Sequence, residues 1–212
     1  MVIADNTLKQ KLSNVYFIWG QGKTTIANAL AERYGCYVYH TDHEREKHVQ
    51  NADPELQPAL CREVPDYWAL EPEDAKQWEK DIVREFTPMV VADLLQLAAQ
   101  YPYVICEGDI DIDLLIPVVS HAVTLSNCGE AYDFFDRPEQ RQLLEDILNR
   151  TDLTEEKKRQ RVENAYSIVS EKGPDVPKET SLYGVKRIFW GNGTTVQETL
   201  ERVAEYFGWN RL

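Results

Sequence analysis

The run from Val15 to Leu30 constrains this chain more than any other feature, because an apolar segment leads through glycine, lysine and two threonines into a helical pattern. Glycines let backbone N–H groups close around a polyphosphate, and a helix N-terminus adds positive potential. The Lys23 ammonium can neutralise phosphate oxygens, and the Thr24 hydroxyl can bind Mg²⁺. We therefore predict a nucleotide phosphate cradle formed by Gly20, Gln21, Gly22, Lys23, Thr24 and Thr25.

The predicted cradle is shorter than the usual phosphate-binding pattern G-x-x-x-x-G-K-[ST], because Gln21 alone separates Gly20 from Gly22. A loop this short cannot wrap a β-phosphate in the usual way. It indicates either a defective nucleotide site or a chain from which loop residues are missing. The intact order of the flanking residues favours the second interpretation, and a plain strand-to-helix turn is the simplest alternative.

Composition sets limits on the class of protein. The chain has 212 residues, 43% of them hydrophobic, which predicts one domain with a full core and a helical insert. A net charge of −13 disfavours nucleic acid and anionic membranes as partners. The segment 1–14 has no apolar core of a signal peptide, and no apolar run could span a bilayer. The scattered cysteines favour reduced thiols and a cytoplasmic location; they are Cys36, Cys61, Cys106 and Cys128.

Short apolar, β-rich runs alternate with helical patterns along the chain, as in a parallel α/β sheet. The predicted strands are 15–19, 36–40, 103–107, 122–126 and 185–190.

The helical patterns between these strands carry their own signals. The helix after the cradle should end at Gly35, and an apolar stripe over 78–97 predicts a helix that Pro88 should kink or divide. A capping box that begins at Thr195 predicts the last helix. Two polar segments do not fit the core. Segment 43–72 is a possible acceptor-binding region and segment 136–172 a possible lid made of two exposed helices.

Acidic residues follow two predicted strands. Ligands of open α/β sheets collect at the carboxyl ends of strands, so Asp42 could hold or deprotonate a phosphoryl acceptor. Its alternative roles are to cap the next helix or to bind a metal with His40 and His43, although no distant ligand pair that would complete such a site is visible. Glu107 lies at the end of the third predicted strand, where a carboxylate can support Mg²⁺. The series Asp109, Asp111 and Asp113 is better explained as a solvated loop and helix start.

Further candidates are basic or lie in a loop. Arg137 and Arg150, at predicted helix boundaries of the possible lid, could stabilise charge on a transferring phosphoryl group, or could form ordinary surface ion pairs. Asn192 lies in a glycine-rich turn that could pass beside an adenine ring, or could simply lead into the last helix.

With these residues the chain resembles the P-loop small-molecule kinases, the superfamily of nucleoside-monophosphate, shikimate, gluconate and 2-phosphoglycerate kinases. The resemblance covers most of the chain and rests mainly on residues 22–25, Asp42, the run 105–108 and the arginine-bearing insert. It implies a three-layer fold with a five-stranded parallel sheet in the order 2-3-1-4-5, a helical lid, and the use of ATP and Mg²⁺. The short cradle departs from the family pattern.

Taken together, these features predict an ATP-dependent kinase. Lys23, Asp42, Arg137 and Arg150 would act in catalysis, Thr24 and Glu107 would hold the metal, and the acceptor would be a small hydroxylated or phosphorylated metabolite. A nucleotide-binding or regulatory module that has lost catalysis is the main alternative. A polynucleotide kinase is disfavoured by the acidic balance, and no motif identifies the acceptor or the oligomeric state.

Overall fold

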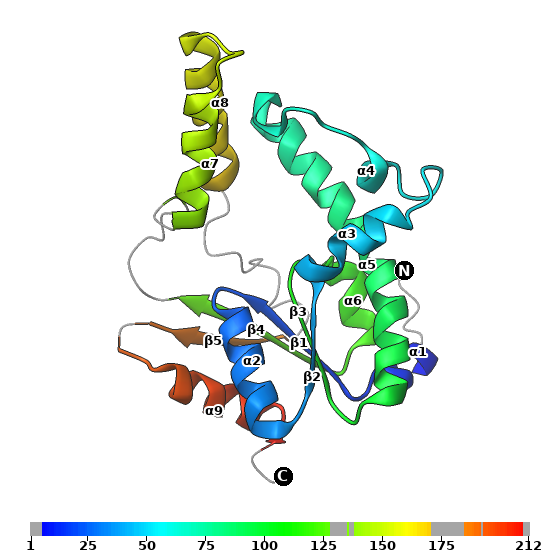
Figure 1. Ribbon diagram of the computed structural model, residues 1–212. Coiled ribbons are helices and arrows are strands. Elements are labelled where there is room, and N and C mark those ends of the chain that lie inside the picture. The colour runs from blue at the N-terminus through cyan, green and yellow to red at the C-terminus, as the bar shows by residue number, and fades with distance from the viewer. Residues whose placement is uncertain (1–5, 128–134, 136–137, 171–184, 192, 210–212) are drawn as a thin grey trace. The chain divides into compact units, whose positions relative to one another are not determined.

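The computed structural model of the chain describes residues 6–127, 135, 138–170, 185–191 and 193–209 (Figure 1). These residues form two compact units. The first comprises the described residues of 1–61, 82–129 and 174–212, and the second those of 62–81 and 130–173.

A five-stranded parallel sheet forms the centre of the first unit, in the order β2-β3-β1-β4-β5. Its strands are β1 (Val15–Gly20), β2 (Tyr37–His40), β3 (Val104–Glu107), β4 (His121–Asn127) and β5 (Lys186–Trp190). All five strands predicted from the apolar runs are present, and the predicted order is confirmed. The runs become strands because both faces of the sheet are covered, which suits continuous apolar segments.

Helices cover the two faces of this sheet and give the unit three layers (Figure 1). On one face α2 (Lys23–Tyr34) and α9 (Val196–Tyr206) pack against alternate residues of β1, Tyr16 and Ile18. On the other face α5 (Pro72–Gln100) packs against Phe17 and Trp19. The remaining elements of this unit are α1 (Asn6–Lys11), α3 (Thr41–Gln50), α4 (Pro58–Cys61), α6 (Ile112–Leu115) and η2 (Ile116–Val118).

Local signals fix several helix ends as predicted. Gly35 ends α2 in a left-handed conformation and donates its N–H to the Ala31 carbonyl. Thr195 and Glu198 form the predicted capping box of α9. Pro88 does not divide α5, which runs on as one helix of 29 residues. Its apolar side is held against the sheet by buried residues on both sides of the proline.

The second unit contains η1 (Tyr67–Ala69), the first turns of α5, and the helices α7 (Pro138–Asn149) and α8 (Glu155–Ser170). The helical pair predicted over 136–172 is therefore present over its described residues. The side-chain amide of Asn164 donates to the carbonyls of Trp68 and Leu70, tying the segment before α5 to α8.

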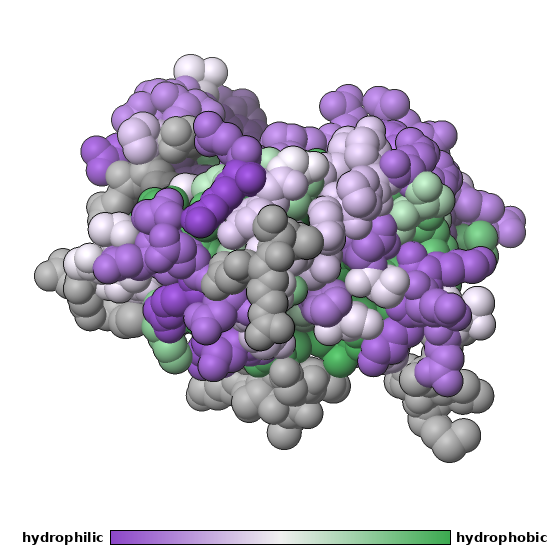
Figure 2. Space-filling view, turned by 90° about the horizontal axis from the view of Figure 1, so that it is seen from below, coloured by the Kyte–Doolittle hydropathy of each residue, from purple (hydrophilic) through white to green (hydrophobic). Residues whose placement is uncertain are grey.

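The surface matches the acidic, polar composition. Hydrophilic residues cover most of the face shown in Figure 2, and apolar residues show only between them. Cys36 and Cys61 are half-buried free thiols and Cys106 is a buried one, whereas Cys128 lies outside the described residues. Among the described residues, no helix is both long and apolar enough to cross a membrane.

Candidate phosphate and cation site

The predicted cradle is a tight turn between β1 and α2. Gly20 still pairs with Leu125 of β4, and the Gln21 N–H donates to the Leu125 carbonyl at 3.1 Å. The Trp190 indole N–H donates to the Gln21 carbonyl at 2.8 Å. The short loop therefore closes as a regular hydrogen-bonded turn between β1 and α2.

Helix α2 begins at Lys23 immediately after this turn. Gly22 is its N-cap, in a left-handed conformation and without a side-chain cap. The first N–H groups of a helix have no intrahelical partner, so those of Lys23, Thr24 and Thr25 can donate to an anion. Lys23 is half-buried, and both threonines are exposed. This end of α2 can bind a phosphate group, but the turn is too short to enclose a polyphosphate chain.

Glu107 joins the turn to the neighbouring strand end. Its side chain is 4% exposed, and Oε1 accepts hydrogen bonds from the Thr24 hydroxyl at 3.2 Å and from His40 Nδ1 at 2.6 Å. Oε2 is buried without a hydrogen-bond partner among the described residues. A buried carboxylate oxygen left without a donor is costly unless a cation approaches it. The Thr24 hydroxyl and the Glu107 carboxylate offer oxygen ligands of the kind that Mg²⁺ prefers, so these residues fit the implied metal.

Asp42 lies in the first turn of α3 and is exposed. The N-cap of α3 is His40, so the alternative that Asp42 caps this helix is wrong. Its role toward an acceptor stays a prediction. The aspartates after β3 follow their simpler interpretation, since Asp111 caps α6 by accepting from the N–H groups of Asp113 and Leu114. The described residues contain no group of three or more metal-ligating side chains, which counts against the His40–Asp42–His43 alternative.

Of the two predicted lid arginines, the structure describes only Arg150. Arg150 lies in the second unit, where its guanidinium pairs with Asp66 at 2.9 Å and Asp152 at 2.6 Å. The hydrogen bond from Arg150 lowers the pKa of Asp152 to about 2. This matches the surface ion-pair alternative, and a role for Arg150 in closing the site stays a prediction. Arg137 and Asn192 lie outside the described residues.

Sequence reasoning missed two residues of this site. Nothing in the sequence pairs Trp190 with Gln21, because they are 169 positions apart. The sequence indicates His40 only as one possible metal ligand, whereas in the structure its partner is Glu107. The one signal for this pair is that His40 and Glu107 end two predicted strands that are neighbours in the sheet. The register of these strands places the two residues side by side.

A polar network anchors α3, which follows His40, to α5. The Tyr39 hydroxyl donates to Asp93 at 3.0 Å and lies 3.0 Å from His48 Nε2, while Lys47 donates to Asp93 at 2.9 Å. Because the single hydroxyl proton of Tyr39 goes to Asp93, His48 Nε2 carries the proton shared with Tyr39. Burial lowers the pKa of His48. Burial alone would raise the pKa of Asp93, but hydrogen bonds from Lys47 and Tyr39 hold it below its ordinary value.

This network predicts a stability that falls on acidification. The unfolded chain takes up the His48 proton near pH 6.5, whereas the folded chain resists it until a lower pH. The contribution of His48 to the free energy of unfolding is therefore fully present above about pH 6.5. It is lost as the pH falls from about 6.5 through the lower pKa of the folded chain, by at most about 1.4 kcal/mol per pH unit. In urea unfolding between pH 7.5 and 5.5, the free energy of unfolding should fall more steeply for the wild type than for His48→Gln. Parallel pH slopes would contradict this.

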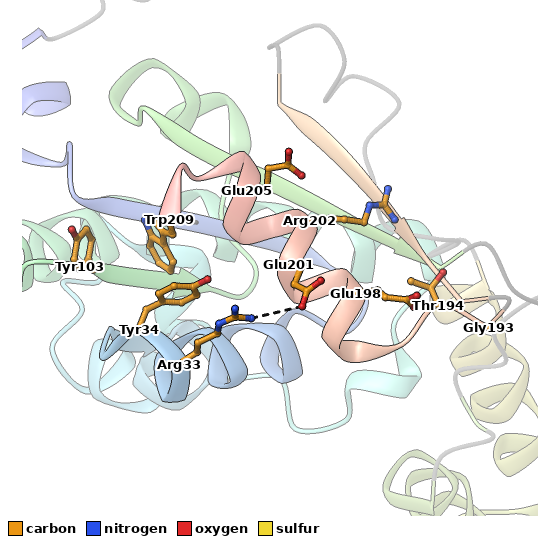
Figure 3. Close-up of a pocket in the computed structure, with 10 residues that line it drawn as sticks. All are labelled: Arg33, Tyr34, Tyr103, Gly193, Thr194, Glu198, Glu201, Arg202, Glu205 and Trp209. Atoms are coloured by element: carbon orange, nitrogen blue, oxygen red, sulfur yellow. Dashed lines mark ion pairs between the residues drawn. The ribbon is translucent and has the colours of Figure 1, made fainter. Parts of the chain in front are cut away.

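A separate hollow of about 1280 Å³ lies along α2 and α9 (Figure 3). Arg33 and Glu201 form an ion pair at 4.0 Å across it, and Tyr34 and Trp209 line one end. Arg33 is at the opposite end of α2 from Lys23, about 15 Å away along the helix axis. None of the predicted site residues that the structure describes lines this hollow, so we assign the chemistry to the cradle instead.

Comparison with known proteins gives distant similarities only. No protein-family model and no curated protein matches the chain. Among solved structures it is similar to a dephospho-CoA kinase from Campylobacter jejuni, with 14% identity and a TM-score of 0.42 over 92% of this chain and 98% of that one. It is also similar to a sugar kinase from a Janibacter species, with 14% identity and a TM-score of 0.38 over 92% and 95%. Similarity this distant does not tell what the present chain binds.

Proposed function

We propose that this protein is an ATP-dependent phosphotransferase that acts on a small hydroxylated or phosphorylated metabolite. The supporting observation is the juxtaposition at the strand ends: the N-terminus of α2 with Lys23 lies beside a buried Glu107 whose Oε2 has no donor among the residues that the structure describes. An anion site and a cation site next to each other suit a magnesium-bound polyphosphate. The net charge of −13 also favours a small acceptor over a polynucleotide.

Each residue has a defined part in this proposal. Lys23 and the first amides of α2 bind the terminal phosphates, while Thr24 and Glu107 hold Mg²⁺, which supplies charge neutralisation when bound. Asp42 orients the acceptor hydroxyl and takes its proton as the oxygen bonds to the γ-phosphorus and the bond to ADP breaks. Positioning and charge neutralisation provide most of the rate acceleration.

A second candidate is a nucleotide sensor without transfer activity. The observation that favours it is the closed turn, in which Trp190 holds the Gln21 carbonyl and no extended loop surrounds a β-phosphate. Such a module would bind nucleotide through α2 and Lys23 but would not hold the γ-phosphate in line with an acceptor.

Calorimetric titration separates these functions. The kinase proposal expects ATP binding that is strengthened by Mg²⁺, followed by transfer of the γ-phosphate to a member of a panel of sugars, nucleosides and hydroxy acids. Binding without transfer to any of them would support the sensor. No binding of ATP, with or without Mg²⁺, would reject both.

The two adjacent threonines offer a matched pair of variants. Thr24→Val removes the hydroxyl that contacts Glu107, so we expect the Mg²⁺ concentration for half-maximal transfer to rise about 10-fold or more. Thr25→Val removes the hydroxyl of a threonine that is also exposed, one position further on, and should have a smaller effect on the metal requirement. Measuring transfer rates over a Mg²⁺ series compares them. Equal shifts in the two variants would argue against a metal role for Thr24.

A further inference from the structure

His40 and Glu107 are the last residues of two neighbouring strands, β2 and β3, and are paired in the parallel register. The Nδ1 of His40 lies 2.6 Å from Glu107 Oε1, a short contact typical of a hydrogen bond to a charged group. A carboxylate can only accept, so Nδ1 carries the proton. His40 therefore holds one particular oxygen of a side chain that is almost fully buried.

The backbone keeps these strand ends close together. Gly108 follows Glu107 with a φ of +134°, and a Cβ at this position would lie 1.7 Å from the Thr41 hydroxyl oxygen. The Thr41 side chain thus fills the space that any other residue at 108 would need. Because Thr41 directly follows His40, the absence of a side chain at Gly108 lets the two strand ends approach closely enough for the short hydrogen bond.

The same Glu107 oxygen also accepts the Thr24 hydroxyl proton at 3.2 Å. A hydroxyl that donates its proton to a carboxylate keeps its lone pairs for another partner, here a cation at the cradle. With Oε1 occupied by His40 and Thr24, Oε2 is the carboxylate oxygen left without a donor in the described part of the chain. The hydrogen bond from His40 therefore helps to orient both oxygen ligands of the proposed cation site, the Glu107 carboxylate and the Thr24 hydroxyl bound to it.

We infer that His40 is a positioning residue for the divalent cation that accompanies the nucleotide, acting through Glu107 on Thr24. This inference rests on the proposed function, because it requires nucleotide to bind at the N-terminus of α2. Partners that orient metal ligands in this way typically change metal affinity by about 10- to 100-fold when removed. In this arrangement His40 acts through its hydrogen bond to Glu107, so its effect should appear in the metal dependence of binding.

The test measures ADP affinity by calorimetry in EDTA and in saturating Mn²⁺, using the full chain. In the wild type Mn²⁺ should tighten ADP binding. His40→Ala should reduce this tightening about 10-fold or more while preserving the affinity for metal-free ADP. His40→Asn places an amide N–H near the position of Nδ1 and should restore most of the tightening. Arg45→Ala, an exposed change on α3, should behave like the wild type.

Each other result has a separate meaning. If His40→Ala keeps the full effect of Mn²⁺, the positioning role is wrong and the proposed function stands. If His40→Ala loses metal-free ADP affinity to the same extent as Mn²⁺-bound affinity, His40 only maintains the local fold and the inference is overturned. If the wild type binds no ADP under either condition, the proposed function itself fails, and the inference fails with it.

Discussion

Replacing Lys23 by alanine is expected to abolish ATP-dependent phosphoryl transfer, with a loss of at least about 100-fold, because no other side chain of the turn carries a positive charge. The ammonium is the group that offsets the charge of the terminal phosphates as the γ-phosphoryl group moves. The protein should stay folded. Lys23 is half-buried at the first position of α2, and changes at such sites outside the core usually alter stability by no more than about 0.5 kcal/mol.

The comparison needs a charge control, because removal of any lysine makes an already acidic chain more negative. Lys9→Ala on the exposed side of α1 changes the net charge equally and should retain full transfer. Transfer rates, ATP calorimetry and thermal unfolding of both variants complete the test. Unchanged turnover in Lys23→Ala would refute the assignment of the cradle, whereas unfolding of this variant would mean that Lys23 has a structural role.

The sequence predicted the sheet well because each strand is an apolar run covered on both faces. The run 104–107 is fully buried, and its composition alone indicates a central strand. Helix α3 enters the sequence analysis only through the alternative that Asp42 caps a following helix, because the segment has few apolar residues to mark one face. It is stabilised instead by local and long-range polar contacts such as that of Lys47 with Asp93. Such contacts leave no periodic signal.

The candidate site was predictable only in part, for a related reason. Lys23, Thr24 and Glu107 belong to local patterns whose order along the chain indicates their chemistry. The contacts of His40 and Trp190 depend on strand register and on side-chain directions, which pair residues 67 and 169 positions apart. The length of the cradle is a third case. The sequence indicates that it is short, but only the sheet geometry tells how the short turn is closed.

Gly20 is the residue through which the closed turn can be tested most directly. Its φ is +87°, and a Cβ at this position would lie 2.0 Å from the carbonyl oxygen of Leu125. That oxygen belongs to β4, which is paired on both sides by β1 and β5 and so has little freedom to move. Gly35 has a similar φ of +69°, but nothing lies within 4 Å of the position of its Cβ.

These two glycines separate backbone strain from steric exclusion. Gly35→Ala should destabilise the fold by about 1 kcal/mol, the typical result of a left-handed conformation alone. Gly20→Ala adds a backbone clash to the same strain, so we expect a loss of about 4 kcal/mol, a large part of the stability of an ordinary domain. Urea unfolding measures both, and a Gly20→Ala protein recovered only in insoluble form would agree with the larger loss.

The comparison also bears on the length of the cradle. The clash exists only if β1 remains paired with β4 through Gly20 and turns at once into α2. In a chain with a longer, open loop, Gly20 would not be pressed against Leu125, and the two alanine variants would be destabilised equally. A clear excess for Gly20→Ala therefore supports a genuine short turn, and with it a site in which Lys23 and the amides of α2 bind phosphate without an enclosing loop.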